Sequence, residues 1–515
     1  MKASKQLSRK AGNDADSPRT LAAVDLGSNS FHLKVARFEN GSLKVIDRIR
    51  EMVRLGGGLN ENQELDTETQ AKALACLNRF GERLRGIPAT NVRIVGTNTL
   101  RKARNSRSFI KSWNKALGHP IEIISGIEEA RLIYLGVAHS LAVNNDRGRL
   151  VVDIGGGSSE IIIGKGFNPV HMESLYMGCV SMSRRYFSNG MISQGSFKKA
   201  RLSALVEMEP MMVKYRQNGW DEAIGASGTI RAASRLACNQ GWCPQGTITS
   251  SGLKKLAALL CQVGDISGLA ELPGMDPERA PVLPGGIAIL QTIFEALDIS
   301  SMQISDGALR EGLLYDQLGR LQHTDVRSLS VEALASRYHT DSVHSAQVKK
   351  TALTLYRQIA ESWQLEDEQW EMLLGWAAQL SEIGLDIAHN QYHKHGAYIV
   401  EHSDLAGFSQ HEQLCLSVLV RAHRRKFPAA LIASLPAPYA EVAEKLAILL
   451  RLAVLLHRSR TDEIPAELSI ESRKKNDLVI HFPNGWLTQH QLQQADLLQE
   501  AEYLRNSQYD LVLTE

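Results

Sequence analysis

The stretch Leu21–Gly41 reads LAAVDLGSNSFHLKVARFENG, and Leu150–Pro169 repeats its pattern as LVVDIGGGSSEIIIGKGFNP. Each stretch is an apolar run, an aspartate, a turn of small residues and a second apolar run. Short runs rich in Val and Ile, joined by residues that tolerate tight turns, predict two β-hairpins. Each hairpin places an aspartate, Asp25 or Asp153, beside its turn. The repeat predicts two similar α/β lobes with a cleft between them.

The two turns are rich in groups that bind anions. Glycines let backbone N–H groups converge on one point, and serine hydroxyls add donors. No GK[ST] follows either turn, and each turn leads into a strand, which argues against a P-loop and a dinucleotide fingerprint. Ordinary glycine-rich hairpins are the alternative, but the matching aspartates favour a phosphate site. The predicted phosphate-binding residues of the turns are Gly27, Ser28, Asn29, Ser30, Gly155, Gly156, Gly157 and Ser158.

A third segment, Val92–Asn105, is predicted to be a strand that passes through a Thr/Asn turn into a basic helix. We expect Arg101 of this helix to clamp a phosphate, because a guanidinium group can bind phosphate oxygens in pairs. Lys102 and Arg104 are explained at least as well by a solvated helix face.

The segment Pro120–Tyr134 is predicted to begin as a strand and to continue as an amphipathic helix. Ser125 and Glu128 have the spacing of a capping box, in which each side chain satisfies the other residue's backbone N–H. Glu129 has no place in that box and lies in the first helical turn after a strand. It is the candidate catalytic carboxylate, with a solvated glutamate favoured by the helix dipole as the alternative.

Asp153 and Glu160 flank the second turn and are candidate ligands of Mg²⁺ (or Mn²⁺). Carboxylates close to bound phosphates are the oxygen ligands that this ion prefers. Asp25 is expected to complete or orient that ligand shell. The alternative is that each aspartate only fixes its own turn by hydrogen bonds to backbone N–H groups.

Six segments carry a family resemblance: DLGSNSFH (25–32), GTNTLR (96–101), ISGIEEARLIY (124–134), DIGGGSSE (153–160), GASGT (225–229) and SDGALREG (305–312). Together they resemble the exopolyphosphatase and guanosine pentaphosphate phosphohydrolase family, over nearly the whole chain. The resemblance implies two ribonuclease-H-like lobes of the actin, sugar kinase and Hsp70 superfamily, and hydrolytic release of a terminal phosphate. It also implies that Glu129 is the catalytic base, that Asp153 and Glu160 are the Mg²⁺-associated carboxylates, and that the two turns are phosphate loops.

Within that family the sequence resembles the long bacterial exopolyphosphatase. Gly157 stands where many pentaphosphatases have alanine, and Asp306 is part of SDGALREG. The expected activity is processive hydrolysis of terminal phosphate from inorganic polyphosphate, with hydrolysis of guanosine pentaphosphate (pppGpp) to ppGpp as the alternative. A sugar kinase would need an acceptor motif, which we do not find. A non-enzymatic sensor is disfavoured by Glu129 and the two turns.

The region from residue 319 to 515 is expected to be all-helical, because Trp370–Ile383 and Val442–Leu456 have apolar residues at helical spacing. It resembles the HD-like domain of the family, but the expected His-Asp pair reads Ser381-Glu382. Hydrolysis at this second site is therefore not expected. We predict a scaffold that extends the polyphosphate path or forms a dimer contact. The histidines near the altered pair are His393, His395, His402 and His423.

The charge distribution divides the chain near residue 320. Residues 1–320 contain 40 basic and 31 acidic residues, whereas residues 321–515 contain 18 and 25. The basic part contains both turns and suits a polyanionic phosphate substrate. The expected division is a flexible tail at 1–18, an N-terminal lobe at 19–135, a second lobe at 136–318 and the helical region at 319–515.

Six scattered cysteines without CxxC spacing suggest neither a disulfide framework nor a zinc cluster, and they favour a reducing cytoplasm. The longest apolar run, Leu446–Leu456, falls short of the ~20 residues that span a bilayer. We expect a homodimer and no nucleic-acid partner. Peripheral association with the inner membrane is left open.

Overall fold

The computed structural model describes residues 19–39, 42–141, 147–321, 325–460, 465, 467–474 and 476–515. The chain divides into two compact units, Met1–Thr324 and Asp325–Glu515. The flexible tail predicted at residues 1–18 lies outside the described residues. Among the residues that are described, no helix combines the length and apolar character needed to cross a membrane.

The first sheet of the N-terminal unit has the strand order β3-β2-β1-β4-β5. Its first three strands form an antiparallel meander, and β4 and β5 continue the sheet in parallel to β1. The predicted hairpin at Leu21–Gly41 is confirmed as β1 and β2. The strands are β1 (Arg19–Leu26), β2 (Phe31–Glu39), β3 (Ser42–Glu51), β4 (Val92–Gly96) and β5 (Glu122–Ile123).

The second sheet repeats this arrangement and adds one strand, in the order β10-β11-β9-β6-β7-β8. Strands β6, β7 and β8 form the antiparallel meander, β9 and β11 are parallel to β6, and β10 is the added antiparallel edge. The shared order confirms two ribonuclease-H-like α/β lobes. The strands are β6 (Gly148–Ile154), β7 (Ser159–Lys165), β8 (Asn168–Leu175), β9 (Glu222–Gly225), β10 (Thr247–Thr249) and β11 (Ser301–Ile304).

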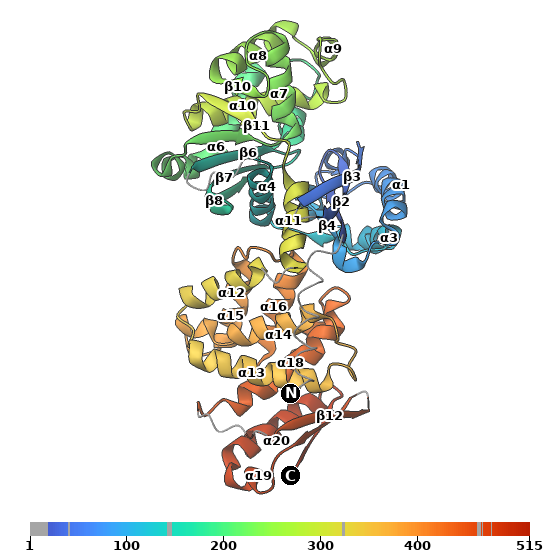
Figure 1. Ribbon diagram of the computed structural model, residues 1–515, viewed down its shortest axis with the longest axis vertical. Coiled ribbons are helices and arrows are strands. Elements are labelled where there is room, and N and C mark those ends of the chain that lie inside the picture. Colours follow the sequence, from blue (N-terminus) through green and yellow to red (C-terminus); the bar gives the residue numbers. More distant parts are fainter. Residues whose placement is uncertain are drawn as a thin grey trace, which may run out of the picture. The chain divides into compact units, whose positions relative to one another are not determined.

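The helices of this unit cover the two sheets (Figure 1). Helices α4 and α11 pack against each other, α4 also contacts β7 and β8, and α11 also contacts β1. The helices are η1 (Leu55–Gly58), α1 (Thr67–Leu84), η2 (Ala89–Asn91), α2 (Asn98–Lys102), α3 (Ser106–Leu117), α4 (Gly126–Ser140), α5 (Cys179–Tyr186), α6 (Gln194–Asn218), α7 (Gly228–Asn239), α8 (Ser250–Val263), α9 (Ile266–Ala270), η3 (Ala280–Val282), α10 (Leu283–Ala296) and α11 (Leu309–Leu321).

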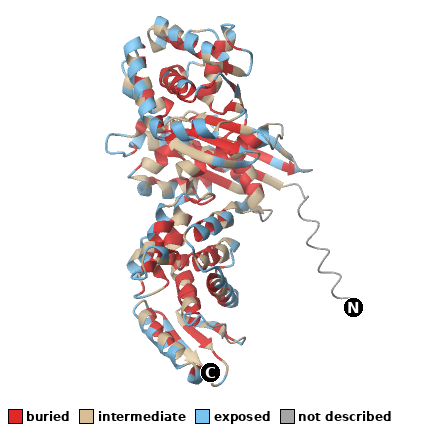
Figure 2. Ribbon diagram, turned by 90° about the vertical axis from the view of Figure 1, so that its left-hand side faces the viewer, coloured by how far each residue is buried: buried red, intermediate tan, exposed pale blue. Residues whose placement is uncertain are grey.

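Strands β1 and β6 are buried on both faces, which explains their continuous apolar runs. Leu21 and Val151 point into one core that also contains residues of α4 and α11. Their neighbours Ala22 and Leu150 point the other way, into the separate core of each lobe. Figure 2 shows this buried interior as the red strands of both sheets. The shared core fixes the two hairpins relative to α4.

Both predicted boundaries in this part of the chain fall inside helices. The division expected after residue 135 lies within α4, and the division expected after residue 318 lies within α11. Because these two helices share a core with strands of both sheets, neither helix belongs to one lobe alone.

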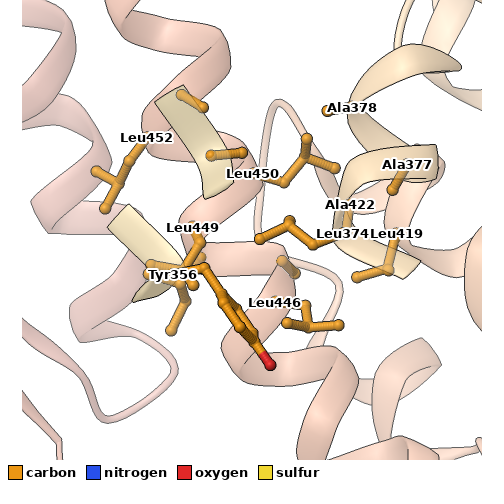
Figure 3. Packing of buried hydrophobic residues seen from close by; sticks show 14 of the residues in the cluster. Tyr356, Leu374, Ala377, Ala378, Leu419, Ala422, Leu446, Leu449, Leu450 and Leu452 are labelled. Carbon is orange, nitrogen blue, oxygen red and sulfur yellow. The ribbon is translucent and has the colours of Figure 1, made fainter. Parts of the chain in front are cut away.

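The C-terminal unit is mainly helical, and Figure 3 shows the packing of α13, α14, α16 and α18 at its core. Its predicted helical segments at Trp370–Ile383 and Val442–Leu456 are found as α14 and α18. The helices are α12 (Val326–Arg337), α13 (Ser342–Ile359), α14 (Glu368–Gln379), η4 (Ile383–Asp386), α15 (Tyr392–His402), α16 (Gln410–Ala422), α17 (Ala429–Ala433), α18 (Tyr439–Leu456), α19 (Trp486–Gln489) and α20 (Gln491–Arg505).

The expectation that this unit is all-helical is wrong for its last part. Strands β12 (Ser469–Lys474), β13 (Asp477–His481) and β14 (Asp510–Thr514) form a sheet in the order β12-β13-β14. Strand β13 pairs antiparallel with β12 and parallel with β14. Leu478, Ile480 and Leu511 join the helical core. The short segments that contain these residues alternate between buried and more exposed positions, which is typical of strands with one buried face.

Candidate active site

The two predicted turns line one cleft. The first turn joins β1 to β2 and the second joins β6 to β7, and their aspartates lie at the ends of β1 and β6. The turns at Ala226–Thr229 and Ala308–Arg310 border the same cleft, as expected for GASGT and SDGALREG. The predicted site residues that line it are Asp25, Gly27, Ser28, Asn29, Ser30, Glu129, Asp153, Gly155, Gly156, Gly157 and Ser158.

Glu129 lies in the first turn of α4 and is presented to this cleft, as predicted. The Ser125 hydroxyl caps the helix by accepting a hydrogen bond from the Glu128 N–H at 3.1 Å. The predicted reciprocal half of the capping box is wrong. The Glu128 carboxylate accepts instead from Arg131, at 2.7 and 2.8 Å, in a buried ion pair. Glu128 is thus structural, and Glu129 faces the cleft.

Arg101 is not among the residues that line the cleft, and the phosphate contact expected of it stays a prediction. Its Nη1 donates to Glu129 Oε2 at 2.9 Å and to the Ile124 carbonyl oxygen at 2.8 Å. The reason is that helix α2 ends beside the β5–α4 junction, where a buried carboxylate needs a partner. Burial raises the pKa of Glu129, and the Arg101 guanidinium opposes that rise.

Four carboxylates interact at the bottom of the site. Burial raises the pKa of Asp25 to about 7 and that of Asp153 to about 7, and the negative charge of Glu129 adds to both shifts. The pKa of Glu160 is raised by its burial and by Glu129 and Asp153. Ser174 Oγ donates to Glu160 Oε1 at 2.8 Å, and Glu160 does not line the cleft.

These acids suit a divalent cation that shares its ligands with a substrate. Within the described residues, no three His, Cys, Asp or Glu side chains are arranged to surround a metal ion by themselves. Mg²⁺ usually takes one or two carboxylates together with phosphate oxygens and retained waters. Burial, together with the charge of Glu129, disfavours the charged forms of Asp25 and Asp153, and a bound cation would favour them.

Three arginines that line the same cleft, here called the basic wall, were not predicted from the sequence. Arg231, Arg279 and Arg310 line the cleft together with His32. Arg310 Nη1 donates to His32 Nδ1 at 2.7 Å, and His32 Nε2 lies 2.8 Å from Ser30 Oγ. Burial and the nearby arginines, with Arg310 first among them, lower the pKa of His32 to about 2, so its ring is neutral.

These arginines come from three distant segments. Arg231 follows GASGT by two residues and Arg310 lies within SDGALREG, so each carried a weak signal. Arg279 stands in no recognisable motif. Arg231 lies 3.3 Å from Asp306, whose side chain is fully exposed. Arg279 lies 3.9 Å from Asp276, whose side chain is partly exposed. Such pairs are weak and leave the guanidinium groups available to an anion.

The altered HD pair in the C-terminal unit forms no metal centre among the described residues. Ser381 is buried, and its hydroxyl donates to the Ala378 carbonyl oxygen at 2.9 Å. The Glu382 carboxylate accepts two hydrogen bonds from Arg460, at 2.8 and 2.9 Å. A guanidinium group thus neutralises the acid of this pair.

Comparisons with known proteins give the class of this protein. The chain matches the model of the Ppx/GppA phosphatase family over residues 34–321 and the model of Ppx/GppA phosphatase, domain III, over residues 326–501. The two lobes and the cleft are therefore those of a hydrolase that acts on phosphoanhydrides. The chain belongs to the Ppx/GppA phosphatase family.

Relatives along nearly the full length share one name. A protein of Vibrio vulnificus (strain YJ016), named guanosine-5'-triphosphate,3'-diphosphate pyrophosphatase, is 39% identical over 495 residues, which are 96% of this chain and 97% of its own. A protein of the same name from Photobacterium profundum is 38% identical over 499 residues, 96% of this chain and 98% of its own. These names support the pppGpp alternative rather than the expected exopolyphosphatase.

Solved structures match the lobes. A structure described as the PPX-GPPA enzyme of Aquifex aeolicus is 26% identical with a TM-score of 0.50, and the match covers 58% of this chain and 99% of that one. An exopolyphosphatase structure from Cytophaga hutchinsonii, 22% identical, has a TM-score of 0.54 over 59% of this chain and 98% of that one. The second likeness bears on the fold alone.

Proposed function

We propose that this enzyme hydrolyses the terminal 5'-phosphoanhydride of pppGpp, giving ppGpp and orthophosphate. The observation that carries the proposal is the 39% identity, over 96% of the chain, to a protein named as a pyrophosphatase for this nucleotide. The arginines of the cleft are consistent with it. The nucleotide pppGpp carries phosphates at two positions. Cationic groups are therefore needed for the phosphates that do not react, in addition to those that bind the terminal phosphate.

The proposed reaction is an in-line attack by water on the terminal phosphorus. Glu129 accepts the proton of that water, and the bridging P–O bond breaks as orthophosphate forms. Arg101 positions Glu129 through their 2.9 Å hydrogen bond and keeps a larger fraction of the carboxylate charged. Backbone N–H groups of the two turns would bind the oxygens of the transferred phosphoryl group.

We assign Asp153, with Asp25 and Glu160, as the residues that would hold Mg²⁺ or Mn²⁺. The ion, when bound, supplies positive charge to the phosphate oxygens. Arg231, Arg279 and Arg310 would bind the phosphates that do not react. Since Arg310 also contacts His32, the neutral imidazole would keep the guanidinium oriented without adding charge.

The decisive experiment compares kcat/KM for phosphate release from pppGpp and from long-chain polyphosphate, with and without Mg²⁺. We expect kcat/KM to be at least about tenfold higher for pppGpp, which corresponds to about 1.4 kcal/mol of transition-state binding. The product must be ppGpp, identified by chromatography. Glu129→Gln, prepared in parallel, controls for contaminating phosphatases. A higher kcat/KM for polyphosphate would overturn the choice of substrate.

Inorganic polyphosphate is the second candidate, because Gly157 and Asp306 resemble the exopolyphosphatase pattern. A further observation favours it. The segment Arg421–Lys426 carries four cationic side chains, and none of them forms an ion pair with a described residue, although the region as a whole is acidic. Such a segment suits a long polyanion. The same assay decides between the two substrates.

Two further properties remain predictions from the sequence, a homodimer and a cytoplasmic location, and peripheral contact with the inner membrane remains the open alternative. Sedimentation equilibrium of the purified full chain tests the first. Fractionation of cells that express the chain, followed by a salt wash of the membranes, tests the other two. A monomer at micromolar concentration, or recovery in a compartment other than the cytoplasm and inner membrane, would overturn the corresponding prediction.

A further inference from the structure

Asn98, of the first lobe, lies directly against Gly157 in the phosphate turn of the second lobe. A Cβ atom built on Gly157 would lie 2.4 Å from Asn98 Oδ1 and 2.9 Å from Asn98 Cγ. Real Cβ atoms essentially never approach a neighbour this closely, so a side chain at position 157 would force Asn98 or the turn to move. Gly157 is therefore required for space as long as Asn98 keeps its position.

The Asn98 side chain lacks a protein partner. It is 5% exposed and lines the cleft, yet its amide forms no hydrogen bond with any residue that the structure describes. The adjacent Thr99 side chain does form a hydrogen bond within the protein, because its Oγ1 donates to Ser28 Oγ at 2.8 Å. Neither amide atom of Asn98 is among the solvent-inaccessible polar atoms that lack a partner in the described residues, so the amide is open to the cleft. A ligand bound in the cleft can therefore supply the partner that the protein does not.

We infer that Asn98 donates a hydrogen bond from its amide nitrogen to the terminal phosphoryl group, and that Gly157 makes room for it. This inference rests on the proposed function, in which a terminal phosphoanhydride is hydrolysed in this cleft. With Oδ1 turned to Gly157, Nδ2 is the donor available to the substrate.

The neighbouring Gly156 provides a matched control. A Cβ atom on Gly156 would meet Ser28 Cβ at 2.9 Å and Val180 Cγ2 at 3.4 Å, and Asn98 is not among its nearest contacts. Alanine at position 156 should therefore disturb the same turn without touching Asn98. Removal of the Asn98 side chain can relieve a clash at position 157 but not one at position 156.

The test is a double-mutant cycle on kcat/KM. We expect Asn98→Ala to lower kcat/KM about 30-fold through loss of one phosphate donor, and Gly157→Ala to lower it about 300-fold through a displaced turn. The double variant should match Asn98→Ala and so exceed Gly157→Ala about tenfold. Asn98→Ala should not improve Gly156→Ala. A double variant as poor as Gly157→Ala, or a Gly157→Ala enzyme with full activity, overturns the coupling.

Asn98→Asp tests the hydrogen bond itself. Aspartate has nearly the same shape, so a residue that only fills space would tolerate it. We expect it to lower kcat/KM more than Asn98→Ala, because it replaces a donor with a negative charge beside phosphate. Activity within about twofold of the wild type would overturn the contact, since even one lost hydrogen bond exceeds that.

Two controls make these outcomes interpretable. Thermal melting of each variant reports whether it folds, and only variants with a melting temperature near that of the wild type enter the cycle. Every variant is assayed on both pppGpp and polyphosphate, and the cycle is read on the substrate that the wild type prefers. Preference for polyphosphate would refute the proposed substrate alone. A failed cycle with normal wild-type turnover of pppGpp would refute the role of Asn98 alone.

Discussion

The two hairpins share a backbone but differ in the residue opposite the aspartate. Asp25 pairs across the strands with His32, and Asp153 at the equivalent position pairs with Glu160. His32 is neutral and hydrogen-bonded to Arg310, whereas Glu160 adds a fourth acid to the site. At this one cross-strand position the first hairpin carries a neutral imidazole bonded to Arg310, which belongs to the basic wall, and the second carries the Glu160 carboxylate, which with Asp153 we call the acidic wall.

The largest effect is expected at Glu129, which belongs to neither hairpin. Replacing it with glutamine keeps the shape and removes the proposed base, so kcat should fall about 1,000-fold. The Kd for pppGpp, measured by calorimetry, should change by less than about threefold, because Gln also relieves repulsion of the phosphates. A kcat within tenfold of the wild type would show that the base lies elsewhere, for instance on one of the hairpins.

The next prediction tests the difference between the two hairpins by replacing Glu160 and His32 in turn. Glu160→Gln should lower kcat about 100-fold and raise the Mg²⁺ concentration needed for half-maximal activity, because it weakens the acidic wall. His32→Gln should raise KM about tenfold through a less ordered Arg310 and leave the Mg²⁺ dependence unchanged. Titration of phosphate release with Mg²⁺ checks both. Equal shifts in the two variants would mean that the walls are not chemically distinct.

The hairpins were predictable from sequence because their signals are local. The short apolar runs on either side of the turns at 27–30 and 155–158 indicate the strands, and the turns fix the register that places Asp25 and Asp153 at the cleft. The N-cap at Ser125 is equally local, and it placed Glu129 in the first turn of α4.

The rest of the site depends on tertiary contacts. Arg279 and Arg310 reach the cleft from segments more than 200 residues away from His32, and no spacing rule links them. Arg101 looked like a phosphate ligand, but its partner is Glu129, which a sequence cannot reveal without the packing of α2 against the β5–α4 junction. Strands β12 to β14 were missed because two long helical patterns dominate the region around them.

Arg101→Ala tests whether Arg101 acts through Glu129, the proposed base. Removing the guanidinium takes away the charge that favours the ionised carboxylate, so the pKa of Glu129 should rise further. The base must be deprotonated to act, and the ascending limb of the pH–kcat/KM profile should therefore move to higher pH by about one unit. At a pH on that limb kcat/KM should fall, and Arg101→Lys should recover part of the loss.

Arg104→Ala is the matched control for that profile, because Arg104 lies two residues beyond Lys102 in the same basic segment and is exposed. Its pH profile should coincide with that of the wild type. If Arg101→Ala lowers kcat/KM equally at every pH, then Arg101 acts by contact with the substrate and not through Glu129.

The smallest expected effect concerns stability, and there the two hairpins should behave alike. The folded pKa of Asp25 and of Asp153 is about 7, against an ordinary value of 3.8, so the folded state binds these protons more tightly than the unfolded chain. Stability is therefore lost as the pH rises from about 4 to about 7 and stays low above that.

Asp25→Asn and Asp153→Asn should each raise the free energy of unfolding by about 1 kcal/mol at pH 8 in the presence of a chelator. At pH 4 neither should do so, because the native carboxyl groups are then protonated in the folded state. Urea unfolding at the two pH values measures this, and a gain confined to one aspartate would mean that the hairpins differ in burial as well as in their cross-strand partners.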